Sequence, residues 1–206
     1  MNKRSGSKPH RPYRQVARAK AAAETGRRII DAFAASAGDR WFDEITLQEV
    51  ATRAGVTVQS VIRRFGSKEG LIKAMIGEFG PAIGAEFSST PGDIDSAVSR
   101  LFTAYERFGD GTVRNLAQEQ RVPALQPLID FGRKEHRRIT AAQFAPWLEK
   151  LAGAERRDAV DALVIATDIY TWKLLRRDME RSLADSKRAV KRLIAAVLAA
   201  YAADTP

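Results

Sequence analysis

Residues 46–65, TLQEVATRAGVTVQSVIRRF, contain two short helical patterns separated by a glycine. Apolar side chains recur at helical spacing in the first pattern, at Leu47, Val50, Ala51 and Ala54. Thr46 precedes this pattern and Glu49 follows Thr46 by three residues, which is the spacing of a capping box. We therefore predict a short helix that begins after Thr46 and buries one face.

The second pattern begins after a predicted turn at Gly55. A glycine adopts the left-handed backbone of a helix end at the lowest cost, so Gly55 is expected to close the first helix. Thr57 is placed to cap the next helix, and Val61 and Phe65 are one helical turn apart and predicted to pack inward. The side chains left mostly outward are Gln59, Ser60, Arg63 and Arg64.

A short helix, a glycine turn and a second helix with a polar and basic outer face are typical of a helix-turn-helix. The DNA major groove is about 12 Å wide and admits one helix, whose N-terminal side chains reach the base edges. An ordinary helical hairpin would have the same inner face. The basic N-terminal segment and the following residues 66–71, GSKEGL, favour the DNA-binding interpretation.

The net charge of +9 is concentrated near the N-terminus. Residues 1–75 carry 15 lysines and arginines against 7 acidic residues, whereas residues 76–206 are nearly balanced, with 19 against 18. Seven of the positive charges precede Ala21, at Lys3, Arg4, Lys8, Arg11, Arg14, Arg18 and Lys20. This distribution indicates a polyanionic partner on one side of the molecule, although a solubilising tail would show the same charges.

The whole chain is predicted to be all-α, because apolar residues follow helical spacing and no alternating strand pattern is found. We expect a basic disordered arm at 1–21, a three-helix DNA-binding domain at 22–67 with its motif at 46–65, and a larger helical domain at 68–206. Pro81, Gly84 and residues 88–92 are predicted to break or kink a helix, and Gly109 and Gly111 are predicted to end the helix that follows Gly92. Residues 154–182 are predicted to form one long helix.

The composition provides little for catalysis or metal binding. The chain has no cysteine and only two histidines, and it lacks a paired-carboxylate, metal or phosphate-loop motif. We therefore expect no catalytic residue, no metal and no cofactor. No apolar run approaches the roughly 20 residues of a membrane span, so a cytoplasmic protein without a membrane partner is expected. A non-specific architectural DNA binder and, less favoured, a helical enzyme remain as alternatives.

The motif closely resembles the DNA-binding domain of the TetR family of transcriptional regulators. The resemblance covers about residues 22–79. It rests on the pattern TLxxVAxxAGVT from Thr46, on FxSKExL from Phe65, and on RIIDAF at 28–33 followed by Trp41 and Phe42. One further stretch, 170–178, looks like the penultimate helix of some members.

This resemblance implies an all-helical homodimer that binds a palindromic double-stranded DNA operator. In the family, the last two helices of each chain form the dimer interface. The larger domain commonly binds a small-molecule effector that changes the spacing of the two DNA-binding domains. Most members are repressors.

Seven residues are the candidates for DNA contacts. Thr57, Gln59 and Ser60 are expected in the groove, where a glutamine amide can pair with adenine through two hydrogen bonds. Arg63 is expected to hold phosphate or to bind guanine. Backbone contacts are expected from Thr46, Arg64 and Lys68. The family often has aromatic residues at the positions of Ile62 and Arg64, so the sequence preference of relatives does not transfer.

The larger domain offers only aromatic residues as candidates for a ligand pocket. These are Phe102, Tyr105, Phe131, Phe144, Trp147, Tyr170 and Trp172. Aromatic side chains at helical spacing more often form a core than a cavity. His136 lies among Arg133, Lys134, Arg137 and Arg138 in the sequence, which predicts a solvated basic face rather than a site.

Overall fold

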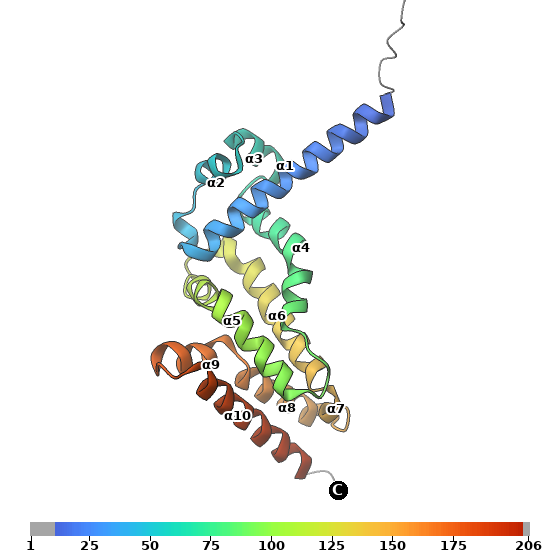
Figure 1. The fold of residues 1–206 in the computed structure, drawn as a ribbon, viewed down its shortest axis with the longest axis vertical. Helices are drawn as coiled ribbons and strands as arrows, with labels where there is room; N and C mark the ends of the chain where they lie inside the picture. Colours follow the sequence, from blue (N-terminus) through green and yellow to red (C-terminus); the bar gives the residue numbers. More distant parts are fainter. Residues whose placement is uncertain (1–10, 204–206) are drawn as a thin grey trace, which may run out of the picture.

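A computed structural model describes residues 11–203, and within this range the chain is helical and contains no strand, as predicted. The elements are α1 Arg11–Asp39, η1 Phe42–Glu44, α2 Leu47–Ala54, α3 Val58–Phe65, α4 Lys68–Phe87, α5 Ile94–Leu116, η2 Pro123–Leu125, α6 Gln126–Gln143, α7 Ala145–Leu148, α8 Gly153–Ala166, α9 Ile169–Lys173, η3 Leu174–Asp178 and α10 Leu183–Ala203. Figure 1 shows α1, α2 and α3 at one end of an elongated molecule and α7 to α10 at the other.

The N-terminal helices enclose their own apolar core. Its centre consists of fully buried side chains at Ile29, Phe33, Phe42, Val50, Ala51 and Val61. Leu71 and Ile72 of α4 and Leu125 of η2 belong to the same cluster. The start of α4 and the turn before α6 therefore support the helix-turn-helix from below (Figure 1).

A second core occupies the C-terminal part. Phe102 of α5, Leu163 of α8 and Trp172 of α9 are buried there, together with Ile194 of α10. Leu116, at the end of α5, packs against both cores. The long helices α4, α5 and α6 thus connect the two cores through continuous packing.

The expected disorder of the arm is wrong for residues 11–21, which belong to the helix α1. Residues 17–23, ARAKAAA, consist of strong helix formers. Extending a helix costs little once its nucleus exists, and the buried face at Ile29 and Phe33 supplies that nucleus. The result is a basic helical segment that projects away from the body of the molecule (Figure 1). The rest of the predicted arm, 1–10, lies outside the described residues.

The break predicted at residues 88–92 is confirmed, since α4 ends at Phe87 and α5 begins at Ile94. No break occurs at Pro81 or Gly84, and the helix end predicted at Gly109 and Gly111 is wrong, since α5 continues to Leu116. The glycines in these helices permit close helix packing instead. A Cβ atom at Gly80 would lie 2.8 Å from the Phe131 ring of α6, and one at Gly109 would lie 2.5 Å from the Trp172 ring. Pro81 is accommodated within α4.

The predicted single helix at 154–182 is interrupted at Thr167 and Asp168. The Asp168 side chain accepts a hydrogen bond from the Tyr170 backbone N–H and so caps the short helix α9. A π-helical turn, η3, follows at Leu174–Asp178. Because aspartate competes for backbone N–H groups, it begins a new helix more readily than it continues an old one.

Candidate nucleic-acid interface

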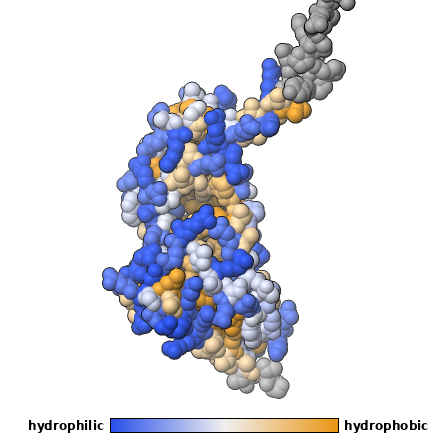
Figure 2. Space-filling view, viewed as in Figure 1, coloured by the Kyte–Doolittle hydropathy of each residue, from blue (hydrophilic) through white to orange (hydrophobic). Residues whose placement is uncertain are grey.

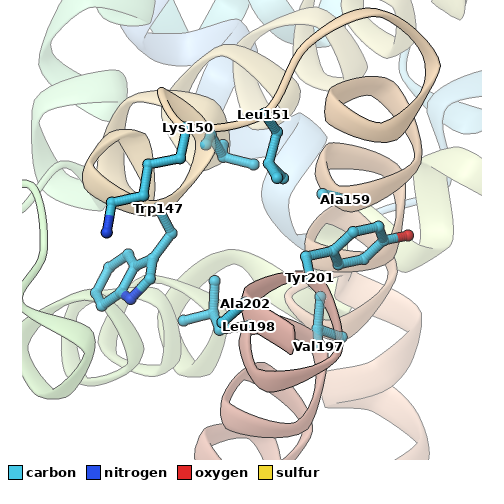
Figure 3. A pocket seen from close by; sticks show the side chains of 9 residues that line it. Trp147, Lys150, Leu151, Ala159, Val197, Leu198, Tyr201 and Ala202 are labelled. Carbon is cyan, nitrogen blue, oxygen red and sulfur yellow. The ribbon is translucent and has the colours of Figure 1, made fainter. Parts of the chain in front are cut away.

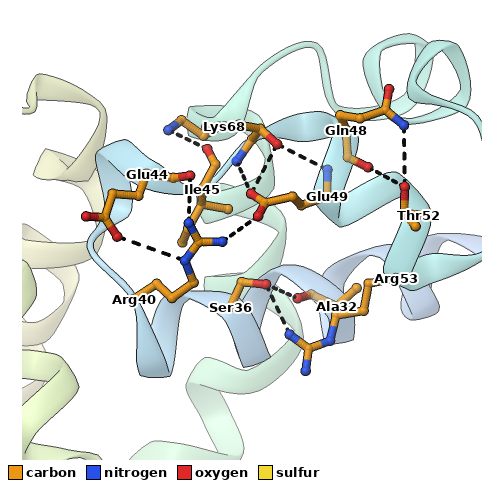
Figure 4. Close-up of polar contacts among 11 residues, drawn as sticks. Ala32, Ser36, Arg40, Glu44, Ile45, Gln48, Glu49, Thr52, Arg53 and Lys68 are labelled. Carbon is orange, nitrogen blue, oxygen red and sulfur yellow. Dashed lines mark hydrogen bonds and ion pairs between the residues drawn. The ribbon is translucent and has the colours of Figure 1, made fainter.

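The helix α2 starts in a complete capping box (Figure 4). The Glu49 backbone N–H donates to the Thr46 hydroxyl at 3.2 Å, and the Thr46 backbone N–H donates to the Glu49 carboxylate at 3.0 Å. Hydrogen bonds to the Glu49 carboxylate from the Thr46 backbone N–H, the Arg40 guanidinium and the Thr46 hydroxyl lower the pKa of Glu49 from 4.5 to about 2. Thr46 is exposed at the start of α2, and its hydroxyl forms its hydrogen bonds within the cap.

The turn between the two helices has the predicted geometry. Gly55 has φ 65° and ψ 42°, in the left-handed region, and its N–H donates to carbonyl oxygens of the last turn of α2. The Val56 N–H donates to the Ala51 carbonyl at 3.0 Å. Ala51 is fully buried, which lets α3 cross α2 closely.

The second helix, α3, begins at the expected cap. The Thr57 hydroxyl accepts a hydrogen bond from the Ser60 N–H at 3.2 Å and lies 3.0 Å from the Ser60 hydroxyl. Val61 is buried, whereas Gln59 and Arg63 are exposed. Within the described residues, neither Gln59 nor Arg63 has a side-chain hydrogen bond or an ion pair. Their polar groups are therefore available on the outer face of α3.

The Arg64 side chain packs against α1, a contact that the sequence did not predict. Its guanidinium packs against α1 at Gly26, where the Nε and Nη2 atoms would lie 2.5 Å from an added Cβ atom. The same guanidinium lies 5.8 Å from the centroid of the Phe65 ring. Arg64 therefore lies between α3 and α1, whereas Gln59 and Arg63 make no such contact.

Lys68, which we expect to contact the DNA backbone, makes contacts within the domain that the sequence did not predict. Its ammonium group donates to the carbonyl oxygens of Phe42 at 2.8 Å and Ile45 at 2.9 Å, and it lies 4.5 Å from the centroid of the Phe42 ring. Burial lowers its pKa, against the opposing effect of Asp43. Lys68 therefore joins the start of α4 to the first residue of η1 and to the residue that follows η1.

The seven aromatic candidates for a ligand pocket do not surround one cavity. Phe102, Tyr105, Phe144 and Trp172 are buried in the C-terminal core, and Phe131 packs against Gly80. Tyr170 is 53% exposed. Trp147 alone of the seven lines the cavity between α7, α8 and α10. The four buried aromatic side chains fill the core because their helical spacing places them on the inner faces of their helices.

His136 is half-buried rather than part of a solvated face. Its Nε2 lies 3.0 Å from the Thr167 hydroxyl, and its Nδ1 lies 3.9 Å from the Asp168 carboxylate. Burial lowers the pKa of His136 despite the nearby Asp168. The sequence contained a signal for this, because His136 and Thr140 continue the helical spacing of the buried Ile129.

Comparison with known proteins identifies the N-terminal part. Residues 29–75 match the family model described as bacterial regulatory proteins, tetR family. A comparison with curated proteins finds no match. No helix within residues 11–203 is both long and apolar enough to cross a membrane. The matched residues include the whole pair α2 and α3, so this part of the chain is similar to the DNA-binding domain of the tetR family, and the match indicates a DNA-binding transcriptional regulator.

Proposed function

We propose that the protein is a ligand-responsive repressor that binds a palindromic operator as a homodimer. The observation that supports this most directly is the outer face of α3, where the side chains of Gln59 and Arg63 have no partner among the described residues. The capped and tightly packed helix pair holds this face rigidly. A rigid helix with free hydrogen-bonding groups suits recognition of base edges.

The groove contacts in this proposal come from Thr57, Gln59 and Ser60, near the N-terminus of α3. Arg63 holds a phosphate, and Arg64 and Thr46 contact the sugar–phosphate backbone. The basic helical segment before Glu24 adds affinity without sequence information, since Arg18 and Lys20 are exposed along it. In functional terms, we place the DNA-binding unit before residue 68 and the regulatory and dimerisation unit after it.

An exposed apolar stripe on α10 supports the proposed dimer. Leu193, Ala196 and Ala200 recur at helical spacing and are exposed, Leu193 by 48%. Ile165, at the end of the neighbouring helix α8, is 69% exposed. Figure 2 shows apolar residues along the lower edge of the molecule, where α10 lies in Figure 1. A two-fold axis through this face would bury the stripe against its own copy.

The proposal is tested by incubating the purified protein with fragmented genomic DNA from its source and sequencing the bound fragments. We expect the enriched fragments to share an inverted repeat, because each half of a two-fold dimer binds the same half-site. The basic segment favours the second candidate, an architectural binder, which would enrich fragments with no common sequence. That outcome would replace the repressor proposal.

A further inference from the structure

A cavity of about 160 Å³ lies at the end of the molecule opposite the DNA-binding helices. Trp147 and Leu151 line it from the α7 side, Ala159 lines it from α8, and Val197 and Tyr201 line it from α10. Figure 3 shows these side chains arranged around an open centre, with Tyr201 on the side away from Trp147. The walls of the cavity are therefore mainly apolar.

The size of the cavity limits what it can hold. Apolar cavities of about 150 Å³ stay dry and take up a benzene-sized molecule. Pockets for larger organic ligands begin at about 300 Å³. The cavity therefore suits a single six-membered ring or a branched chain of similar volume.

Lys150 supplies a charge at the rim. Its side chain is exposed and, within the described residues, has no ion pair or hydrogen bond. Figure 3 shows it running from the chain after α7 toward the Trp147 indole. An ammonium group next to an apolar cavity favours a ligand with an anionic group on an apolar body, because a charge-assisted hydrogen bond adds to the burial of the ring.

We propose that this cavity binds a small aromatic monocarboxylate, with its ring between Trp147, Ala159 and Tyr201 and its carboxylate on the Lys150 ammonium. The cavity wall on α10 lies on a different side of that helix from the stripe at Leu193. A bound ring would fix α10 against α7 and α8, and so fix the face that we assign to the dimer. This second step rests on the proposed function, whereas binding itself does not.

Benzoate is the probe, and calorimetry of the full chain without DNA measures its binding. We expect one saturable site per chain. Lys150→Met should weaken benzoate about tenfold, which is within the range of a charge-assisted hydrogen bond. It should leave benzyl alcohol, which has the same ring and no charge, unchanged. Lys134→Met removes an exposed charge on α6 and serves as the control, with wild-type affinity for both probes.

Ala159→Leu tests the cavity itself. The larger side chain fills the space, so we expect it to abolish binding of both probes. If this variant does not fold, the titrations of Lys150→Met with benzoate and benzyl alcohol still test the proposed site. Absence of saturable benzoate binding, or equal benzoate affinity in the wild type and in Lys150→Met, overturns the proposed site.

A second titration measures DNA affinity with and without saturating benzoate. A change in affinity supports the coupling through α10. Benzoate binding without any change in DNA affinity overturns the coupling and leaves the site intact. Failure of the protein to bind DNA at all overturns the proposed function. Calorimetry without DNA still shows whether the cavity binds benzoate.

Discussion

At the scale of single residues, Gln59 has the clearest role in the proposal. It is exposed on α3, two residues after the capping residue Thr57. We predict that Gln59→Ala costs roughly 1–3 kcal/mol on the operator and relaxes preference at one base position. Titration against operators altered one position at a time measures both effects.

The control for this variant is Gln120→Ala, which removes an exposed glutamine from the turn after α5. It should bind every operator like the wild type. If Gln59→Ala weakens binding to all DNA sequences equally, Gln59 contacts the DNA backbone rather than the base edges in the groove.

Arg64 should contribute affinity without specificity. Its guanidinium packs against Gly26 of α1, and we propose that it contacts a phosphate rather than a base. We predict that Arg64→Gln weakens binding to operator and random DNA alike. The slope of log affinity against log salt should fall in magnitude by about one. Lys134→Gln makes the same charge change on α6 and should leave the slope unaltered.

At the scale of elements, the start of α2 should be sensitive to acid. The pKa of Glu49 is lowered in the folded state, so its ionised form stabilises the fold at pH values above the ordinary 4.5. That stabilisation is lost as the pH falls from about 4.5 toward about 2. We predict that Glu49→Gln lowers the melting temperature at pH 6 and makes it less dependent on pH in this range.

Thermal unfolding between pH 2 and pH 6 measures the effect. Glu24→Gln removes an exposed acid on α1 that has no ion pair within the described residues, and it should reproduce the wild-type curve. A Glu49→Gln curve parallel to the wild type would show that the capping box does not depend on this charge.

The packing of α5 on α9 depends on Gly109. A Cβ atom there would meet the Trp172 ring at 2.5 Å, and the ring is itself buried and held by a hydrogen bond to Glu106 at 2.9 Å. We predict that Gly109→Ala destabilises the protein by about 1–3 kcal/mol through overpacking. Gly132→Ala on α6 meets no neighbour and should stabilise the protein, by up to about 1 kcal/mol. Urea unfolding compares the two variants.

The sequence predicts an element well where local chemistry determines it. The caps at Thr46 and Thr57 and the turn at Gly55 follow from residue type and spacing alone. Gly109 was misleading, since its role depends on the Trp172 ring from a distant helix. The contacts of Arg64 and Lys68 were missed for the same reason, because their partners lie on other elements.

At the scale of the whole molecule, the proposed dimer depends on the stripe along α10. Leu193 is its largest exposed side chain. We predict that Leu193→Glu converts the dimer to a monomer, because a charge at the centre of a two-fold interface meets its own copy. Sedimentation velocity measures the mass. Arg188→Glu, on an exposed but separate side of the helix, should remain a dimer.

The central claim is sequence-specific recognition by α3, and one measurement tests it most directly. The affinity for the most enriched inverted repeat is compared with that for a scrambled duplex of the same composition at one fixed salt concentration. Specific regulators discriminate by about 10³-fold or more. We predict a ratio in that range that falls on substitution of Gln59. A ratio near one would contradict the account and indicate binding to the DNA backbone alone.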